Sequence, residues 1–289
     1  RLMKKIIVGG CSFTDKNMPK RAVPNPMDFK MWPEILGEIT NYEIINTARC
    51  GAGNKKIFSD VTNEIVKHEP KDIAYVIVAW SEWTRQDILS DNTPFTDSAW
   101  RTIVPHISDE RDKILEEKKL ETRFFPHHEE NVDKIYSGIQ AKYPRDKDII
   151  SEQLQTMFHF QSLCEYLNID YRQMQMLSPF PWWRKKELYD NYHDSIIKYD
   201  QTKEEKRTNQ EHQKKTRTLL LMNNPITTIL DDSKFIGFPI FDRIGGHTIL
   251  DIITRKYGRT GYRINDIDAH PNEECQRFIA EVVSKTLDL

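Results

Sequence analysis

Short apolar segments alternate with amphipathic segments along most of the chain. Apolar runs of strand length, typical of buried strands, lie at residues 5–8, 42–46, 73–80 and 169–177. Residues 73–80 are apolar on both faces and rich in β-branched side chains, so we expect this strand at the centre of the sheet. Apolar positions recur at helical spacing in residues 32–39, 57–67, 149–168, 249–256 and 272–287.

This alternation predicts an α/β fold. Strands that alternate with helices are joined by right-handed crossovers, which makes the sheet parallel. We therefore expect a three-layer α/β/α, flavodoxin-like, doubly wound sheet of about five strands, with a site at the carboxyl ends of the strands. The 289 residues fit one domain, residues 1–289. Two polar, charged stretches, at about 85–150 and 179–216, are predicted to be helical insertions that form a cap or arm over the site.

Composition narrows the class of protein. Lys and Arg number 42 and Asp and Glu 44, so the net charge of −2 favours neither nucleic acid nor an anionic membrane as partner. No apolar run approaches the ~18 residues of a membrane span, and no signal-peptide pattern opens the chain, so we expect a cytoplasmic location. The four cysteines lack metal-ligand spacing, so we expect reduced thiols and neither metal nor cofactor.

Small and polar residues follow the predicted strands. Ser12 lies in the turn after the first strand, where an exposed nucleophile or a phosphate cradle can be built. Gly51 belongs to the loop after the second strand, which can offer bare N–H groups or simply begin a helix. Ser81 follows the third strand, and Asp268 and His270 precede the last helix, a pairing typical of an oriented general base.

The order of these segments resembles the SGNH/GDSL hydrolase superfamily. That family has a serine block after strand 1, a glycine block after strand 2, a Gly-x-Asn-Asp block after strand 3 and an Asp-x-x-His block before the last helix. The resemblance covers about half of the chain and implies Ser12 as nucleophile, His270 as base and an acyl-enzyme mechanism on an ester. The sequences Gly-Cys-Ser-Phe-Thr and Asp-x-His-Pro-Asn, with Trp80 and Arg85 around Ser81, further resemble SGNH-like proteins of tailed phages and some bacteria. This branch implies a virion-associated location if the chain is phage-encoded.

Two positions depart from the family pattern. Ser81 stands where the family has the oxyanion-hole Asn, so the predicted oxyanion hole consists of the N–H groups of Ser12 and Gly51 with help from Ser81. Asp268 lies two residues before His270 instead of three. Residues two apart on an extended segment share a side, so we expect Asp268 to orient the histidine, with Asp266 in reserve.

The expected substrate is a small-molecule or carbohydrate ester, with an O-acylated carbohydrate as one candidate. Trp80, Arg85, Trp182 and Trp183 are the predicted substrate-binding residues, although Trp182 and Trp183 can equally form an apolar plug under the second insertion. A non-catalytic structural or carbohydrate-binding relative of these hydrolases is the alternative. A nucleotide-binding domain ranks last, because the turn at residues 9–12 has no Lys and no Gly-x-Gly-x-x-Gly run.

Overall fold

The computed structural model describes residues 4–22, 25–89, 100–103, 146–180, 215–237, 248–266 and 268–287. The strands are β1 (Lys5–Gly9), β2 (Glu43–Asn46), β3 (Ile73–Trp80), β4 (Gln86–Leu89), β5 (Trp100–Ile103) and β6 (Tyr171–Gln175). The α-helices are α1 (Trp32–Thr40), α2 (Asn54–Ile65), α5 (Asp146–Tyr166), α8 (Ile249–Gly261) and α9 (Glu273–Ser284), and residues 215–222 are also helical. Short 3-10 turns lie at Pro19–Arg21, Pro70–Asp72, Pro225–Thr228 and Asp232–Lys234.

The main sheet is parallel and has the order β2-β1-β3-β6. A segment that we did not predict as a strand continues the sheet beyond β6. The Ile236 N–H donates to the Gln173 carbonyl at 2.7 Å, and the Gln175 N–H donates to the Gly237 carbonyl at 3.0 Å. Four strands plus this segment give the flavodoxin-like order that we predicted, in a three-layer α/β/α fold.

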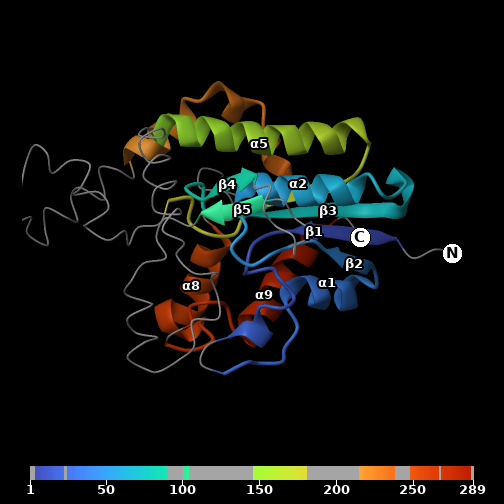
Figure 1. Cartoon of the computed structure of the whole chain (residues 1–289), viewed down its shortest axis with the longest axis vertical. Coiled ribbons are helices and arrows are strands. Elements are labelled where there is room, and N and C mark those ends of the chain that lie inside the picture. The colour runs from blue at the N-terminus through green and yellow to red at the C-terminus, as the bar shows by residue number, and fades with distance from the viewer. Residues whose placement is uncertain are drawn as a thin grey trace, which may run out of the picture.

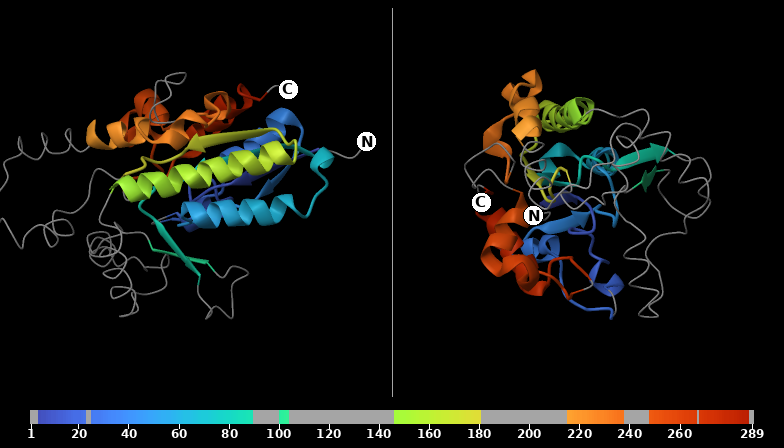
Figure 2. Two further views of the ribbon diagram at one scale, coloured as in Figure 1. Left: turned by 90° about the horizontal axis from the view of Figure 1, so that it is seen from above. Right: turned by 90° about the vertical axis from the view of Figure 1, so that its left-hand side faces the viewer.

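Helices cover both faces of the sheet (Figure 1). Helices α2 and α5 lie side by side on one face, and α1, α8 and α9 lie on the other (Figure 2). Side chains of β3 alternate between the two layers: Tyr75 and Ile77 join the cluster under α1 and α9, whereas Val76 and Val78 pack under α2 and α5. Burial on both faces explains why the whole strand is apolar. Among the described residues, no helix has the length and apolar character needed to cross a bilayer.

The start of the first insertion differs from our expectation. Strands β4 and β5 pair antiparallel, where we predicted helical structure. Ile88, Trp100, Thr102 and Ile103 are β-branched or aromatic, which favours strands. The last residues of the insertion, 146–150, are helical as predicted, and residues 90–99 and 104–145 lie outside the described residues.

The ends of both insertions meet at one place beside the main sheet. The Trp83 ring, just before the first insertion, packs edge-on against Phe180, at the start of the second, with 5.8 Å between the ring centroids. Arg217, just after the second insertion, lies 4.3 Å over the Phe180 ring. The same guanidinium donates at 2.6 Å to Asp146, which begins α5 near the end of the first insertion. Both insertions therefore leave and rejoin the core at a common base, as one cap requires, although the cap itself stays a prediction.

Asp87 on β4 caps helix α2 from outside that helix. Its carboxylate accepts hydrogen bonds from the N–H groups of Gly53, at 3.1 Å, and Lys56, at 2.9 Å. The Thr102 hydroxyl on β5 also donates to it. The N-cap residue of α2 is Gly53, which has no side chain to do this, so the hairpin satisfies the orphan donors of the helix. A Cβ on Gly53 would lie 2.6 Å from Asp87 Oδ2, so only glycine lets the carboxylate approach.

We predict that Asp87→Ala lowers the free energy of unfolding by about 1–2 kcal/mol, the usual loss for a helix cap. Asp170→Ala is the matched control, because the Asp170 side chain is 64% exposed, and it should change little. Gly53→Ala should destabilise the wild-type chain more than it destabilises Asp87→Ala, since the second background removes the clash. Urea denaturation measures the free energy of unfolding of the wild type, of the three single variants and of the double variant. Equal costs of Gly53→Ala in both backgrounds would contradict the cap.

Candidate active site

The turn after β1 and the loop after β2 meet at the carboxyl edge of the sheet. The chain reverses direction across the sheet between β1 and β3, the position at which doubly wound folds bind ligands. Asn46, at the end of β2, joins the two loops. Its Nδ2 donates to the Thr14 carbonyl at 2.8 Å, and its Oδ1 accepts from the Ala48 N–H at 3.0 Å. The Arg49 N–H also donates to the Gly10 carbonyl at 3.1 Å.

Asp15 is a second clamp between these loops. Its carboxylate is 1% exposed and accepts hydrogen bonds from the N–H groups of Asn17 and Cys50, both at 2.9 Å. The half-exposed Arg21 guanidinium lies 3.6 Å away. The bond to the Cys50 N–H fixes the Arg49–Cys50 peptide, which precedes the peptide that carries the Gly51 N–H. Asp15 therefore determines where the backbone of the glycine loop lies relative to Ser12.

Ser12 and Gly51 both present unused backbone donors at this edge. Ser12 is 5% exposed and lies in a tight turn, in which the N–H groups of Thr14 and Asp15 bond to the Cys11 carbonyl. Gly51 has a φ of 79°, a conformation that favours glycine. Neither the Ser12 nor the Gly51 N–H has an acceptor among the described residues. Two free N–H groups on neighbouring loops are the parts from which an oxyanion hole is made.

His270 and Asp268 form a close carboxylate–imidazole pair. The Nδ1 of His270 lies 2.5 Å from Asp268 Oδ1, and the same oxygen accepts the His270 backbone N–H at 3.1 Å. Asp268 is buried, and the His270 side chain is 17% exposed. Asp266, the reserve candidate, is exposed. A carboxylate at Nδ1 leaves Nε2 to accept a proton, which is the arrangement of a general base.

The loop that carries this pair is held by backbone bonds on both sides. The Ile264 N–H donates to the His270 carbonyl, and the Asn272 N–H donates to the Tyr262 carbonyl, each at 2.8 Å. Within the loop, Asn265 Oδ1 accepts the Asp268 N–H at 2.8 Å. Asn272 then caps α9 by accepting the Cys275 N–H. The histidine thus sits in a small closed loop directly before a helix, with little freedom to move.

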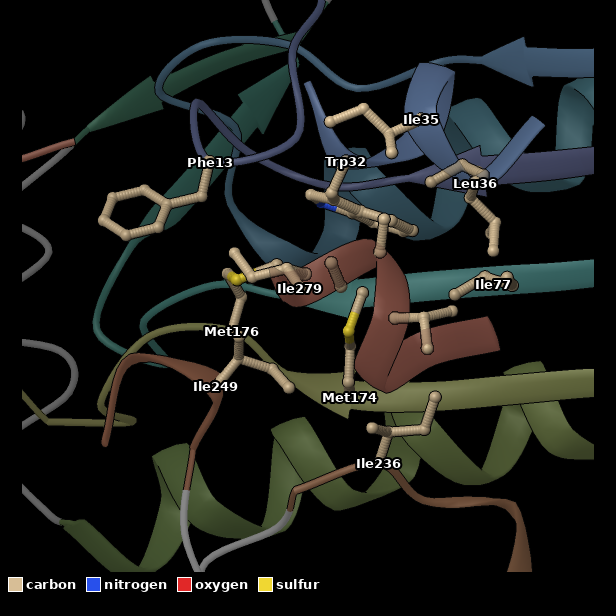
Figure 3. Close-up of a cluster of buried hydrophobic side chains, with 14 of the residues drawn as sticks. Phe13, Trp32, Ile35, Leu36, Ile77, Met174, Met176, Ile236, Ile249 and Ile279 are labelled. Carbon is tan, nitrogen blue, oxygen red and sulfur yellow. The ribbon is translucent and has the colours of Figure 1, made fainter. Parts of the chain in front are cut away.

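Phe13 brings the histidine loop to the serine turn. The rings of Phe13 and His270 are 5.2 Å apart between centroids. Phe13 projects from the turn after β1 at the edge of the core cluster that contains Trp32 and Met176 (Figure 3). Ser12 and His270 therefore lie on packed segments, but no hydrogen bond joins their side chains in the described part of the chain. Such bonds are often long in free enzymes and tighten when substrate binds.

Ser81 lies in the block after β3, but its hydroxyl does not face solvent. Ser81 is fully buried, and its Oγ has no hydrogen-bond partner. Its N–H donates to Asn54 Oδ1 at 2.7 Å, and its carbonyl accepts from Gln175 Nε2 at 2.8 Å. These bonds hold the backbone in place. The predicted contribution of Ser81 to the oxyanion hole would require its side chain to become accessible.

The predicted substrate-binding residues fall in different places. Trp80 is a core residue: it is fully buried, donates to Gln173 Oε1 at 2.9 Å and packs edge-on against Phe160. Side chains of β3 alternate between the two faces of the sheet, and the Trp80 ring lies on the face covered by α5. This burial is incompatible with direct contact between the ring and a substrate. Arg85 lies beside the glycine loop, with an N–H bonded to the Ala52 carbonyl at 3.1 Å. Trp182 and Trp183 lie outside the described residues.

Sequence reasoning missed three residues that build the site. Asp15 and Asn265 are loop residues whose side chains bind backbone N–H groups, a common property of Asp and Asn that indicates a turn without indicating its partner. Phe13 reads as an ordinary apolar residue. Cys11, next to Ser12, is fully buried and packs in the core.

Comparisons with known proteins include a distant structural likeness. No family model and no curated protein matches the chain. A solved structure described as a "putative lipolytic protein of G-D-S-L family", from Desulfitobacterium hafniense DCB-2, is 12% identical, with a TM-score of 0.39. The match covers 98% of this chain and 99% of that chain. Because this TM-score is low, the likeness carries no argument about function, and the fold follows from the strand order and contacts of the chain itself.

The described residues contain no group of three or more His, Cys, Asp or Glu side chains placed to hold a metal ion. The adjacent His127 and His128 lie outside the described residues.

We predict that Cys50 resists alkylation although it lies beside Gly51. Burial, reinforced by the Asp15 carboxylate, raises the pKa of the Cys50 thiol to about 11, so the thiol stays protonated at neutral pH. Iodoacetamide at pH 8 should modify Cys50 at least about tenfold more slowly than a cysteine in an unfolded peptide, and the rate should rise towards pH 11. Peptide mapping by mass spectrometry measures the rate. Rapid labelling of Cys50 at pH 7 would contradict the raised pKa of this thiol.

Proposed function

We propose that the chain is an SGNH-type serine hydrolase that cleaves esters, of the branch found in phages and some bacteria. The observation that carries this proposal is the Asp268–His270 pair, with 2.5 Å between Oδ1 and Nδ1, held against the Ser12 turn through Phe13. The free N–H groups of Ser12 and Gly51 on the same edge support it. The order of these segments along the chain is the order of the catalytic blocks in that superfamily.

The chemistry is acyl transfer in two steps. Ser12 Oγ attacks the ester carbonyl while its proton passes to His270 Nε2, and Asp268 holds the imidazole by Nδ1. The developing oxyanion accepts hydrogen bonds from the N–H groups of Ser12 and Gly51. When the carbonyl re-forms, the leaving alcohol takes the proton from His270. Water then attacks the acyl-enzyme by the same route and releases the acid.

A carbohydrate ester is the substrate class that we favour. Trp182 and Trp183 follow β6 in the sequence, and aromatic side chains suit stacking on a sugar ring. The candidate partner is therefore a small-molecule or carbohydrate ester. In the mechanism proposed above, both steps use only side chains and N–H groups of the chain, with water as the second nucleophile.

Two observations favour a second candidate function. Ser12 is only 5% exposed, and the third block has Ser81 in place of an amide donor. A non-catalytic structural or carbohydrate-binding protein, built on the same fold, fits these two facts. Covalent labelling of Ser12 separates the candidates.

We predict that an alkyl fluorophosphonate labels Ser12 and that a Ser12→Ala variant stays unlabelled. The reason is that the probe reacts only with a serine activated by a base and an oxyanion hole. Mass spectrometry locates the adduct. Ser178→Ala is the control variant: the Ser178 hydroxyl donates to the Phe180 carbonyl, and its loss should leave the labelling of Ser12 unchanged. An adduct on another serine would exclude Ser12 as the nucleophile, and the absence of any adduct would contradict the serine hydrolase function.

We predict that Asp268→Asn lowers turnover of an aryl acetate by roughly 10²–10⁴, whereas Asp266→Asn changes it less than about twofold. The two substitutions are chemically identical, but only Asp268 contacts the imidazole, while Asp266 is exposed. His270→Ala should reduce turnover at least as far as Asp268→Asn. A larger loss with Asp266→Asn would reassign the acid, and wild-type turnover in His270→Ala would end the catalytic interpretation.

A further inference from the structure

The two backbone donors of the candidate oxyanion hole lack a side-chain companion from the block after β3. Ser81 Oγ is buried and unpartnered, and the backbone of Ser81 is held by Asn54 and Gln175. A hydroxyl in that position has no access to the edge where Ser12 and Gly51 lie. Four residues further along the chain lies Arg85, whose long side chain carries several N–H donors.

The Arg85 guanidinium is rigidly placed. Its Nε donates to Glu82 Oε2 at 3.0 Å and its Nη1 donates to the Ala52 carbonyl at 3.1 Å. The side chains of Arg85 and Glu82 are 8% and 7% exposed. A buried ion pair with a further bond to a carbonyl fixes both the plane and the rotation of the guanidinium. No reorganisation is then needed when a new negative charge appears beside it.

Arg85 lies beside the glycine loop. Ala52, whose carbonyl it binds, directly follows Gly51. The same loop is bonded to the serine turn, because the Cys50 N–H donates to Asp15 and the Arg49 N–H donates to the Gly10 carbonyl. The two bonds of Arg85 use one N–H of Nε and one of Nη1, and the Nη2 donors have no acceptor among the described residues. Unused donors of a fixed cation thus lie beside the loop that carries the Gly51 N–H.

We propose that Arg85 is a catalytic residue that donates a hydrogen bond to the oxyanion formed when Ser12 attacks the ester, in the place of the missing amide. This inference rests on the serine hydrolase function proposed above. Arg85 remains protonated throughout: the bond between Ser12 Oγ and the carbonyl carbon forms, the Oγ proton goes to His270, and the negative charge on oxygen is returned when the leaving group departs. Glu82 balances the cation in the resting enzyme, and the protonated His270 balances the oxyanion when it forms.

The test is the turnover of a neutral aryl acetate by two Arg85 variants. Arg85→Lys keeps a cation beside Glu82 but cannot hold Glu82, Ala52 and the oxyanion at once. The double variant Glu82→Gln with Arg85→Gln removes both charges, so that neither stays buried and unpaired. We expect kcat to fall by roughly 10²–10³ in each, with KM changed less than about threefold, because the lost bond exists only in the transition state.

Arg172→Lys is the matched control. Arg172 is likewise buried and donates its Nε to a carbonyl, that of Thr286, but it lies near the start of β6, away from the carboxyl edge. This variant should lose stability without losing kcat. A kcat within about threefold of wild type in either Arg85 variant that folds would overturn the proposal.

Three further measurements show which part of the account fails: turnover of an anionic ester, turnover by Ser12→Ala, and inhibition by phenylboronic acid. A loss of activity confined to an anionic ester, such as a monoaryl succinate, with the aryl acetate unaffected, would overturn the proposal by showing that Arg85 binds a substrate anion. Full activity in Ser12→Ala would show that the serine hydrolase function itself is wrong. Inactive Ser12→Ala together with active Arg85 variants would refute the role of Arg85 alone. Weaker inhibition of Arg85→Lys by phenylboronic acid, which forms a tetrahedral anion on a serine, by the same factor as the loss of kcat would support it.

Discussion

The parallel pairing of β1 with β2 on one side and β3 on the other is the constraint on which the candidate site depends. Parallel pairing brings the carboxyl ends of all three strands to one edge, so that their following loops meet there. The strand order reverses between β1 and β3, the position at which doubly wound folds bind ligands. The loop before α9 reaches the same edge because α9 packs against α1, the helix that follows the β1 turn. Backbone pairing thus assembles Ser12, Gly51 and His270 from distant parts of the sequence.

Polar side chains then fix the loops that the sheet brings together. Asp15 and Asn46 tie the serine turn to the glycine loop, and Asp87 ties the β4–β5 hairpin to the start of α2. Each clamp binds backbone N–H groups that would otherwise be unsatisfied near the core, so losing one costs both stability and loop position. Because Asp87 bonds to Gly53, two residues after Gly51, the hairpin of the first insertion is mechanically linked to the candidate oxyanion hole.

Much of the fold could be predicted because its strands and helices are strongly patterned. Residues 73–80 are buried on both faces and were predicted as a strand with the bounds that the structure shows. The segment after Phe235 was missed because Gly237 and Pro239 interrupt its apolar pattern, although two hydrogen bonds join its described residues to β6. The site was predictable as a set of loops, because strand ends and turn residues are local features. Phe13, Asp15 and the burial of Trp80 were not, because each depends on which segments pack together, and a local pattern does not encode that.

The central claim is that the serine turn and the histidine loop act as one catalytic unit, and a double-mutant cycle on Ser12 and His270 tests it most directly. Turnover of an aryl acetate is measured for Ser12→Ala, His270→Ala and the double variant, each against the uncatalysed reaction. If the two side chains act together, the double variant loses no more than the worse single variant, since removing either already disables proton transfer. Losses that multiply, or a Ser12→Ala variant with wild-type turnover, would show that the two residues work independently and contradict the account.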